Sequence, residues 1–208
     1  MDDLPPNHHA DDNGKFSGPF GYVAALTMVA GRGGDARVVT KMAGVSSTDH
    51  VLDVGCGPGT AVRHAARTGA RVTGIDPGQP MLNLAKAVTK VRPPTGAIEW
   101  VNAGCEDIPL PDSSVSVCWS LASVHHWPQL EAGIAEVARV LEPGGLFIAL
   151  EKKTPEGASG LASHGWTVQQ AEAFAAMLPP FGFTDAEVDT HVTGRRTVLT
   201  VSARTVLA

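Results

Sequence analysis

A glycine-rich turn between an apolar run and a helical segment has the clearest capacity in this sequence to bind a ligand. It lies between Val51 and Thr60 and has glycines at positions 55, 57 and 59. Glycine lets the backbone bend sharply and approach a ligand closely, and the N-terminus of the following helix offers unpaired N–H groups to an anion. The turn therefore predicts a binding site of the mononucleotide type.

Two acidic residues narrow the kind of ligand. Asp53 lies two residues before Gly55, at the carboxyl end of the first predicted strand. A carboxylate there would oppose a pyrophosphate but could hold an ammonium group. Asp76 lies 21 residues after Gly55, at the end of the second strand, where an acid can bind the hydroxyls of a ribose. A ligand with an ammonium group, a carboxylate and a ribose fits better than a dinucleotide.

Two adjacent histidines could perform acid–base chemistry. His125 and His126 follow the fourth predicted strand, and Glu151 ends the next one. Ligands of open α/β sheets bind at these carboxyl ends, and an imidazole, with a pKa of about 6.5, is a common base at neutral pH. We favour His125 as the base, because Val124 and His126 should point the other way, with Glu151 as its orienting partner. The alternative is that the pair only caps a strand and packs a loop.

Alternating strands and helices must position these residues. The strands predicted by apolar and β-branched runs are residues 51–54, 71–75, 98–101, 115–120 and 146–150. The helices predicted by apolar spacing are residues 61–67, 80–91, 130–141 and 168–177, the third of which stops at Pro143–Gly144–Gly145. Such alternation implies a parallel sheet with helices on both faces.

The last part of the chain predicts a different arrangement of strands. Residues 186–191 and 197–205 are joined by the turn-prone pair Thr193–Gly194 and predict an antiparallel hairpin. We therefore expect a Rossmann-like, doubly wound α/β sheet of about seven strands, mostly parallel, with this hairpin at its end.

The N-terminal residues are predicted to be a flexible arm. Residues 1–18 are polar, and we expect a single domain at 19–208 whose first part, 19–45, forms short cap helices broken at Gly31–Gly34. His8 and His9 could bind a metal, or could close over the site with Phe16 and Phe20. We expect a disordered arm and no metal site.

Five short motifs occur in a fixed order. They are D-x-G-x-G-x-G at Asp53–Gly59, G-I-D at Gly74–Asp76, C-E-D-I-P at Cys105–Pro109, V-H-H-W-P at Val124–Pro128 and R-V-L-E-P-G-G at Arg139–Gly145. Together they resemble the class I S-adenosylmethionine (SAM)-dependent methyltransferases, in the small-molecule branch related to the ubiquinone and menaquinone pathway enzymes. The resemblance covers roughly residues 51–150 and implies a methyltransferase that uses SAM as its cofactor. A Rossmann-type dehydrogenase is the alternative.

The resemblance also implies which residues hold SAM. Asp53 would lie near its amino group, and Asp76 would bind its ribose hydroxyls. The full set of implied cofactor-binding residues is Asp53, Gly55, Cys56, Gly57, Gly59, Asp76, Pro77, Met81, Gly104, Cys105, Glu106 and Ser120. Many relatives have an aspartate where this chain has Gly104, so Glu106 or a water would replace that contact with the adenine amino group.

Sugar and polyketide O-methyltransferases that resemble this sequence pair a histidine after strand four with an acid after strand five. The resemblance therefore implies that His125 or His126, with Glu151, deprotonates a hydroxyl of a small molecule, a sugar or a lipid-linked intermediate. His164, Trp166 and Phe20 are expected to contact this acceptor. For His164 and Trp166 the alternative is a polar loop before a helix capped by Thr167. C- or N-methylation, or SAM binding without catalysis, are the alternative functions.

Composition excludes several classes of protein. The chain has 208 residues, a net charge of −5, 18% charged and 43% hydrophobic residues. The length predicts one domain, and the acidic balance argues against a nucleic-acid partner. We expect a cytoplasmic protein, because no apolar run approaches the roughly 18 residues of a membrane span and the start does not resemble a secretory signal. A short segment after residue 150 favours an open cleft for a bulky or extended acceptor, or a cleft completed by the N-terminal arm or by a second subunit, as in a homodimer.

Overall fold

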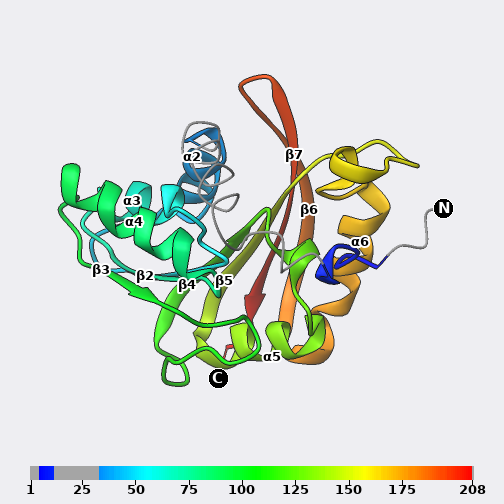
Figure 1. The fold of residues 1–208 in the computed structure, drawn as a ribbon. Helices are drawn as coiled ribbons and strands as arrows, with labels where there is room; N and C mark the ends of the chain where they lie inside the picture. Colours follow the sequence, from blue (N-terminus) through cyan, green and yellow to red (C-terminus); the bar gives the residue numbers. More distant parts are fainter. Residues whose placement is uncertain (1–4, 12–32, 208) are drawn as a thin grey trace.

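A mixed sheet of seven strands forms the centre of the fold (Figure 1). The computed structural model describes residues 5–11 and 33–207. The strand order is β3-β2-β1-β4-β5-β7-β6; β1 to β5 are parallel, and β7 pairs antiparallel with both β5 and β6. The strands are β1 (His50–Val54), β2 (Arg71–Ile75), β3 (Ile98–Val101), β4 (Val115–Leu121), β5 (Leu141–Lys152), β6 (Phe183–Thr193) and β7 (Arg196–Thr205).

Helices cover both faces of this sheet and bury two separate apolar clusters. The helices are α2 (Gly33–Met42), α3 (Thr60–Ala66), α4 (Gln79–Val91), α5 (Leu130–Val140) and α6 (Val168–Met177). Side chains of α2, α3 and α4 share one cluster with Val51 of β1, whereas α5 and α6 share the other with Leu52. Neighbouring strand residues point to opposite faces, so strands such as β1, β4 and β5 contribute to both clusters.

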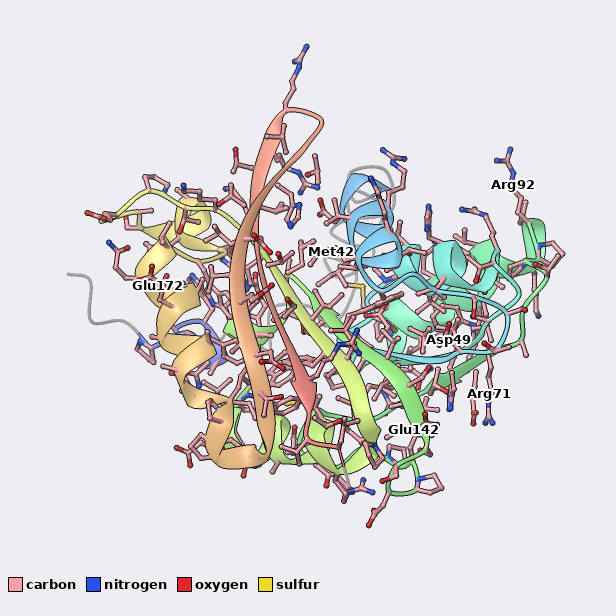
Figure 2. All side chains as sticks on the ribbon, turned by 180° about the vertical axis from the view of Figure 1, so that it is seen from behind. Met42, Asp49, Arg71, Arg92, Glu142 and Glu172 are labelled. Carbon is pink, nitrogen blue, oxygen red and sulfur yellow. The ribbon has the colours of Figure 1, made fainter. Side chains whose placement is uncertain are left out.

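Many charged side chains lie at the periphery of the fold. Arg71, Arg92, Glu142 and Glu172 are all exposed, and Figure 2 shows them around the edge of the molecule. In the part of the chain that the structure describes, no helix has the length and apolarity needed to cross a membrane.

The predicted doubly wound sheet with a terminal hairpin is confirmed. One boundary prediction is wrong: the helix that begins at Leu130 does not run to the glycines, because β5 already begins at Leu141. Leu141 pairs with Val115, and the next pair is Val117 with Leu146, so β5 contains extra residues there. Gly144, at a φ of +76°, lies in this irregular stretch, so it bends a strand rather than ending a helix.

Parts of the N-terminal prediction lie outside the described residues. These parts are Phe16, Phe20 and the first predicted cap helix at residues 23–30. The second cap helix is present as α2, which begins at Gly33 within the predicted break. Asp35 in its first turn accepts hydrogen bonds from Thr193 and Arg196, which ties α2 to the β6–β7 hairpin.

Helix α6 begins with the predicted cap at Thr167. The Thr167 hydroxyl accepts from the Gln170 backbone N–H at 3.2 Å, and the Gln170 side chain accepts from the Thr167 N–H at 2.9 Å. We expect Thr167→Ala to lower the free energy of unfolding by about 1 kcal/mol, because one N–H of the first turn loses its acceptor. Urea denaturation measures this change. Thr190→Ala, at an exposed position of β6, is the control and should stay within about 0.5 kcal/mol of the wild type; equal losses would contradict the capping role.

Candidate active site

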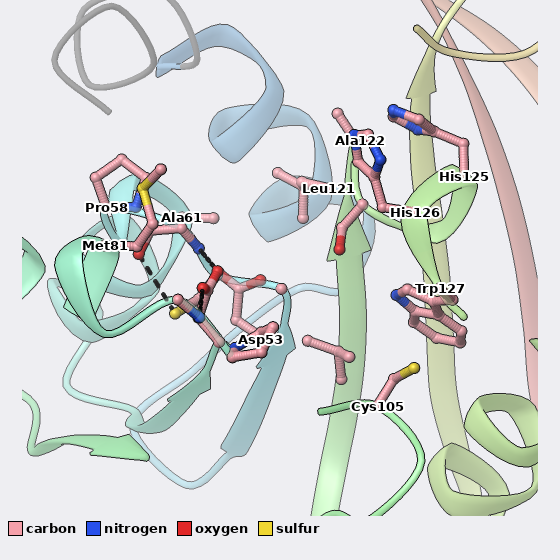
Figure 3. Close-up of a pocket in the computed structure, with 18 of the residues that line it drawn as sticks. Asp53, Pro58, Ala61, Met81, Cys105, Leu121, Ala122, His125, His126 and Trp127 are labelled. Atoms are coloured by element: carbon pink, nitrogen blue, oxygen red, sulfur yellow. Dashed lines mark hydrogen bonds between the residues drawn. The ribbon is translucent and has the colours of Figure 1, made fainter. Parts of the chain in front are cut away.

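One cavity opens at the carboxyl ends of β1, β2 and β4 (Figure 3). Its volume is about 600 Å³, within the range of small-molecule sites. Figure 3 shows Asp53 and Met81 on one side of it and His125, His126 and Trp127 on the other. The predicted site residues that line it are Asp53, Gly55, Cys56, Gly57, Asp76, Pro77, Met81, Gly104, Cys105, Glu106, His125, His126 and His164.

The glycine turn presents its backbone to the cavity. Gly55 and Cys56 both donate their N–H groups to the carbonyl of Ile75 at 2.9 Å, which fastens the turn to the end of β2. Gly57 has a φ of +52°, and a Cβ there would meet no described atom within 4 Å. Gly59 does not line the cavity; a Cβ there would collide with the ring of Trp100, so this glycine permits close packing.

Asp76 holds two loops of the cavity in place. Its carboxylate accepts from the backbone N–H of Gly57 at 2.8 Å and from that of Gly78 at 2.7 Å. Burial raises the pKa of Asp76, and these two hydrogen bonds oppose the rise. Carboxylate oxygens have further lone pairs, so Asp76 can also accept hydrogen bonds from a ligand's hydroxyls.

Two buried cysteines close to Asp53 have thiols with raised pKa values. Asp53 is buried at the end of β1 and lines the cavity. Burial raises the pKa of the Cys56 thiol, and the neighbouring Asp53 raises it further; burial also raises the pKa of Cys118. Both thiols therefore stay protonated at neutral pH, so neither is a reactive nucleophile.

The loop after β3 supplies the predicted adenine end. A Cβ on Gly104 would lie against the Glu106 carboxylate, and the Cys105 thiol donates to Glu106 Oε2 at 3.4 Å. The Glu106 carboxylate thus lies beside Gly104, where the sequence analysis expected Glu106 or a water to replace an aspartate. Ser120, also predicted to bind the cofactor, does not line the cavity, and its hydroxyl is buried without a hydrogen-bond partner among the described residues.

His125 and Glu151 form a buried pair. His125 Nδ1 lies 2.8 Å from Glu151 Oε2, and the two side chains are 3% and 0% exposed. The parallel pairing of Leu121 with Leu150 brings the ends of β4 and β5 side by side, which explains the contact. The structure therefore brings together the histidine and the acid that the sequence analysis paired.

His126 also faces the cavity, contrary to the expectation that it would point away. Residues Val124–His126 form a short 3₁₀ helix, so successive side chains do not alternate as in a strand. The rings of His125 and His126 have centroids 4.1 Å apart. Burial, and to a smaller extent the neighbouring His125, lower the pKa of His126 to about 4, so His126 is neutral at pH 7.

Residues 5–11 lie against this site. The His9 N–H donates to the His125 carbonyl at 2.9 Å, and His126 Nδ1 lies 3.1 Å from the His9 carbonyl. The ring of His9 stacks on that of His164 with centroids 4.0 Å apart. The sequence alone allows either a disordered arm or closure of His8 and His9 over the site. For residues 5–11 these contacts favour closure. No local sequence signal indicates such contacts, because they join residues more than a hundred positions apart.

Trp166 lies in the core and does not line the cavity. Its backbone bonds to Lys152 and Thr154 continue the edge of β5, and its ring packs on Phe174 of α6. Its indole N–H donates to the Pro6 carbonyl at 2.7 Å. Trp166 therefore does not form the predicted aromatic wall for an acceptor in this cavity. It anchors the N-terminal segment instead.

Sequence reasoning missed several residues that line the cavity. They are Asp35, Thr60, Trp127, Lys152 and Arg196. Asp35 and Arg196 form an ion pair of 2.9 Å, although 161 positions separate them. Neither belongs to a motif, so only the tertiary structure identifies them.

Residues 52–149 match the family model described as "Methyltransferase domain". The demethylmenaquinone methyltransferase of Tropheryma whipplei (strain Twist) is 37% identical over 120 residues, 57% of this chain and 48% of that protein. The fatty-acid O-methyltransferase of Mycolicibacterium smegmatis is 35% identical over 100 residues, 47% of this chain and 35% of that protein. This chain thus matches less than half the length of these relatives.

Solved structures confirm the fold. A SAM-dependent methyltransferase from Aquifex aeolicus has a TM-score of 0.70 and 19% identity, with 95% of this chain and 98% of that chain covered. The fold and the cavity define a Rossmann-like α/β domain built to bind a nucleoside-containing ligand. The family model matched by residues 52–149 and the quinone-pathway relative support a relationship of this chain to the class I SAM-dependent methyltransferases.

The residues of the cavity fit SAM, the cofactor of this family. Asp53 would hold its ammonium group and Asp76 its ribose hydroxyls, while the open space at Gly57 would admit its methionine part. Thr60 Oγ1, at the start of α3, is buried with no hydrogen-bond partner among the described residues, and it would bond to the ligand's carboxylate. The donors and acceptors therefore match the ammonium group, the ribose hydroxyls and the carboxylate of SAM.

Gly57→Ala tests this placement of the cofactor. The added methyl group would project into the cavity, so we expect the Kd for SAM to rise at least about tenfold, a loss of about 1.4 kcal/mol. Gly194→Ala is a matched control, because Gly194 also has a positive φ and open space but lies at the hairpin tip outside the cavity. Both should lose about 1–2 kcal/mol of stability. Calorimetry that finds unchanged SAM affinity in Gly57→Ala would refute the placement.

Proposed function

We propose that this protein transfers the methyl group of SAM to a hydroxyl group of a small molecule, a sugar or a lipid-linked intermediate. In this proposal His125 is the general base and Glu151 orients it. The observation that carries the proposal is the buried pair of 2.8 Å between His125 Nδ1 and Glu151 Oε2, beside the cavity that fits SAM. The similarity to a fatty-acid O-methyltransferase supports transfer to oxygen.

The Glu151 carboxylate favours one tautomer of His125. It accepts a hydrogen bond from the Nδ1–H group, so that Nε2 carries the lone pair that can act as the base. When Nε2 takes a proton from the acceptor hydroxyl, the buried carboxylate 2.8 Å away stabilises the resulting imidazolium. Glu151 thus acts through His125, as a positioning and charge-stabilising residue.

When bound, SAM supplies an electrophilic methyl carbon on a sulfonium sulfur. The new O–C bond forms as the C–S bond breaks, the sulfur keeps that electron pair, and the hydroxyl proton moves to His125 Nε2. The rest of the catalysis is positioning, because holding two reactants in line lowers the barrier by roughly 7–11 kcal/mol. The walls of the cavity provide this alignment.

His126 is a weaker candidate for the base. Its pKa is lowered to about 4, chiefly by burial, and its Nδ1 lies against the His9 carbonyl. A base with so low a pKa holds a transferred proton poorly at neutral pH. His125 instead has the buried Glu151 carboxylate 2.8 Å from its Nδ1, which supports His125 as the base.

The acceptor side of the proposal rests on the cavity beyond the glycine turn. His164 would contact the acceptor there, and Lys152 and Arg196 would contribute positive charge to the same wall. We also propose that the protein is cytoplasmic and that it has no nucleic-acid partner. The net charge of −5 supports the second of these statements. The homodimer, and the boundary between an arm at residues 1–18 and a domain at residues 19–208, stay predictions.

Three variants test the base. We expect His125→Ala to lower turnover by about 10²–10⁴-fold and Glu151→Gln by a smaller factor, with the Kd for SAM nearly unchanged. His191→Ala is the control, because His191 bonds to Thr200 on the terminal hairpin, away from the cavity. Methyl-labelled SAM and an extract of small molecules provide the assay, read by mass spectrometry.

The results of these assays distinguish O-methylation from C- or N-methylation and from SAM binding without catalysis. Turnover within twofold of the wild type in both His125→Ala and Glu151→Gln would contradict the base assignment. A labelled methyl group on carbon or nitrogen, located by NMR, would contradict O-methylation. SAM binding without any labelled product would indicate a binding protein.

A further inference from the structure

Three histidines meet at the acceptor end of the cavity. One ring nitrogen from each of His125, His126 and His164 lies within 4.8 Å of the other two. The first two come from the 3₁₀ helix after β4 and the third from the segment after β5, so the cluster joins two loops. All three residues line the cavity, which gives the cluster access to solutes.

Two of these imidazoles already have the outer partners that metal-binding histidines use. His125 Nδ1 lies 2.8 Å from the Glu151 carboxylate, and His126 Nδ1 lies 3.1 Å from the backbone carbonyl of His9. A metal-ligating histidine usually donates its second ring N–H to a carboxylate or a backbone carbonyl, which fixes the ring and makes the other nitrogen a better ligand. In such an arrangement Nε2 would be the ligand atom of both His125 and His126.

The spacing of the three nitrogens suits a transition metal. Tetrahedral Zn²⁺ with Zn–N distances of about 2.0–2.1 Å has ligand nitrogens roughly 3.4 Å apart. The nitrogens are at most 4.8 Å apart, so each pair has to approach by no more than about 1.4 Å, which small rotations of the side chains can provide. Three imidazoles favour Zn²⁺, Co²⁺ or Ni²⁺ over Mg²⁺ and Ca²⁺, which prefer oxygen ligands.

We propose that His125, His126 and His164 bind one divalent transition metal ion, with Zn²⁺ as the physiological candidate, and that this ion inhibits methyl transfer. The sequence analysis expected no metal site. Inhibition follows because the metal and the transferred proton compete for the same lone pair on His125 Nε2; this half of the inference rests on the proposed function. A fourth coordination position remains open to the cavity for water.

Direct metal binding tests the site without any assay of activity. Co²⁺ is titrated into the full-length protein, purified without a histidine tag, and followed by its visible absorption and by calorimetry. We expect one equivalent of Co²⁺ to bind, displaceable by Zn²⁺. His164→Ala and His126→Ala should each raise the Kd for Co²⁺ at least about tenfold, because one of three ligands is lost.

Two further variants keep the test interpretable. Glu151→Gln should weaken Co²⁺ binding about 10–100-fold by removing the outer partner of His125, as in other metal sites. His191→Ala should bind Co²⁺ like the wild type, because His191 lies outside the cavity. Circular dichroism establishes that each variant is folded before its titration is interpreted.

Inhibition is measured on the same preparation. Stoichiometric Zn²⁺ should reduce turnover at least about tenfold, and EDTA should restore it. Absence of Co²⁺ binding, or binding unchanged in both His164→Ala and His126→Ala, would overturn the metal site and leave the proposed base untouched. Tight binding at the three histidines without inhibition would overturn the competition at His125 and, with it, the assignment of that residue as the base.

Discussion

The parallel pairing of β1 with β2 on one side and β4 on the other is the constraint on which the site depends. From β1 the chain first builds outward through β2 and β3, then returns to build β4 and β5 on the opposite side. The loops that leave β1 and β4 therefore diverge, and a cavity forms between them. Asp53 lies near the carboxyl end of β1, paired with Gly74 of β2 and Trp119 of β4.

Most of the fold could be predicted from the sequence because local patterns and tertiary contacts agree. The runs at 71–75 and 98–101 have the bounds of β2 and β3, since turn residues flank both. The prediction failed at Gly144, where a glycine after a helix normally marks a stop. There the pairing of Leu141 with β4 starts a strand at once, so a long-range interaction outweighs the local signal.

Some features of the site could likewise be predicted from the sequence, and others could not. The pairing of His125 with Glu151 follows from strand order alone, because both residues come just after or at the ends of adjacent parallel strands. The inward direction of His126 does not, since it depends on a 3₁₀ turn that strand alternation cannot predict. The positions of Trp166 and His9 depend on contacts between distant parts of the chain, which no spacing rule contains.

The N-terminal segment contacts the cavity region partly through main-chain atoms, beside side-chain contacts such as the stacking of His9 on His164. The Pro6 carbonyl accepts from Trp166, the His9 N–H donates to the His125 carbonyl, and the His9 carbonyl lies against His126 Nδ1. Main-chain groups are common to nearly all amino acids, so these attachments survive replacement of the side chains around them. Substitution of other side chains in the segment can therefore leave these main-chain contacts in place, so the wall of the cavity near His125 and His126 can change while the glycine turn on the other side stays as it is.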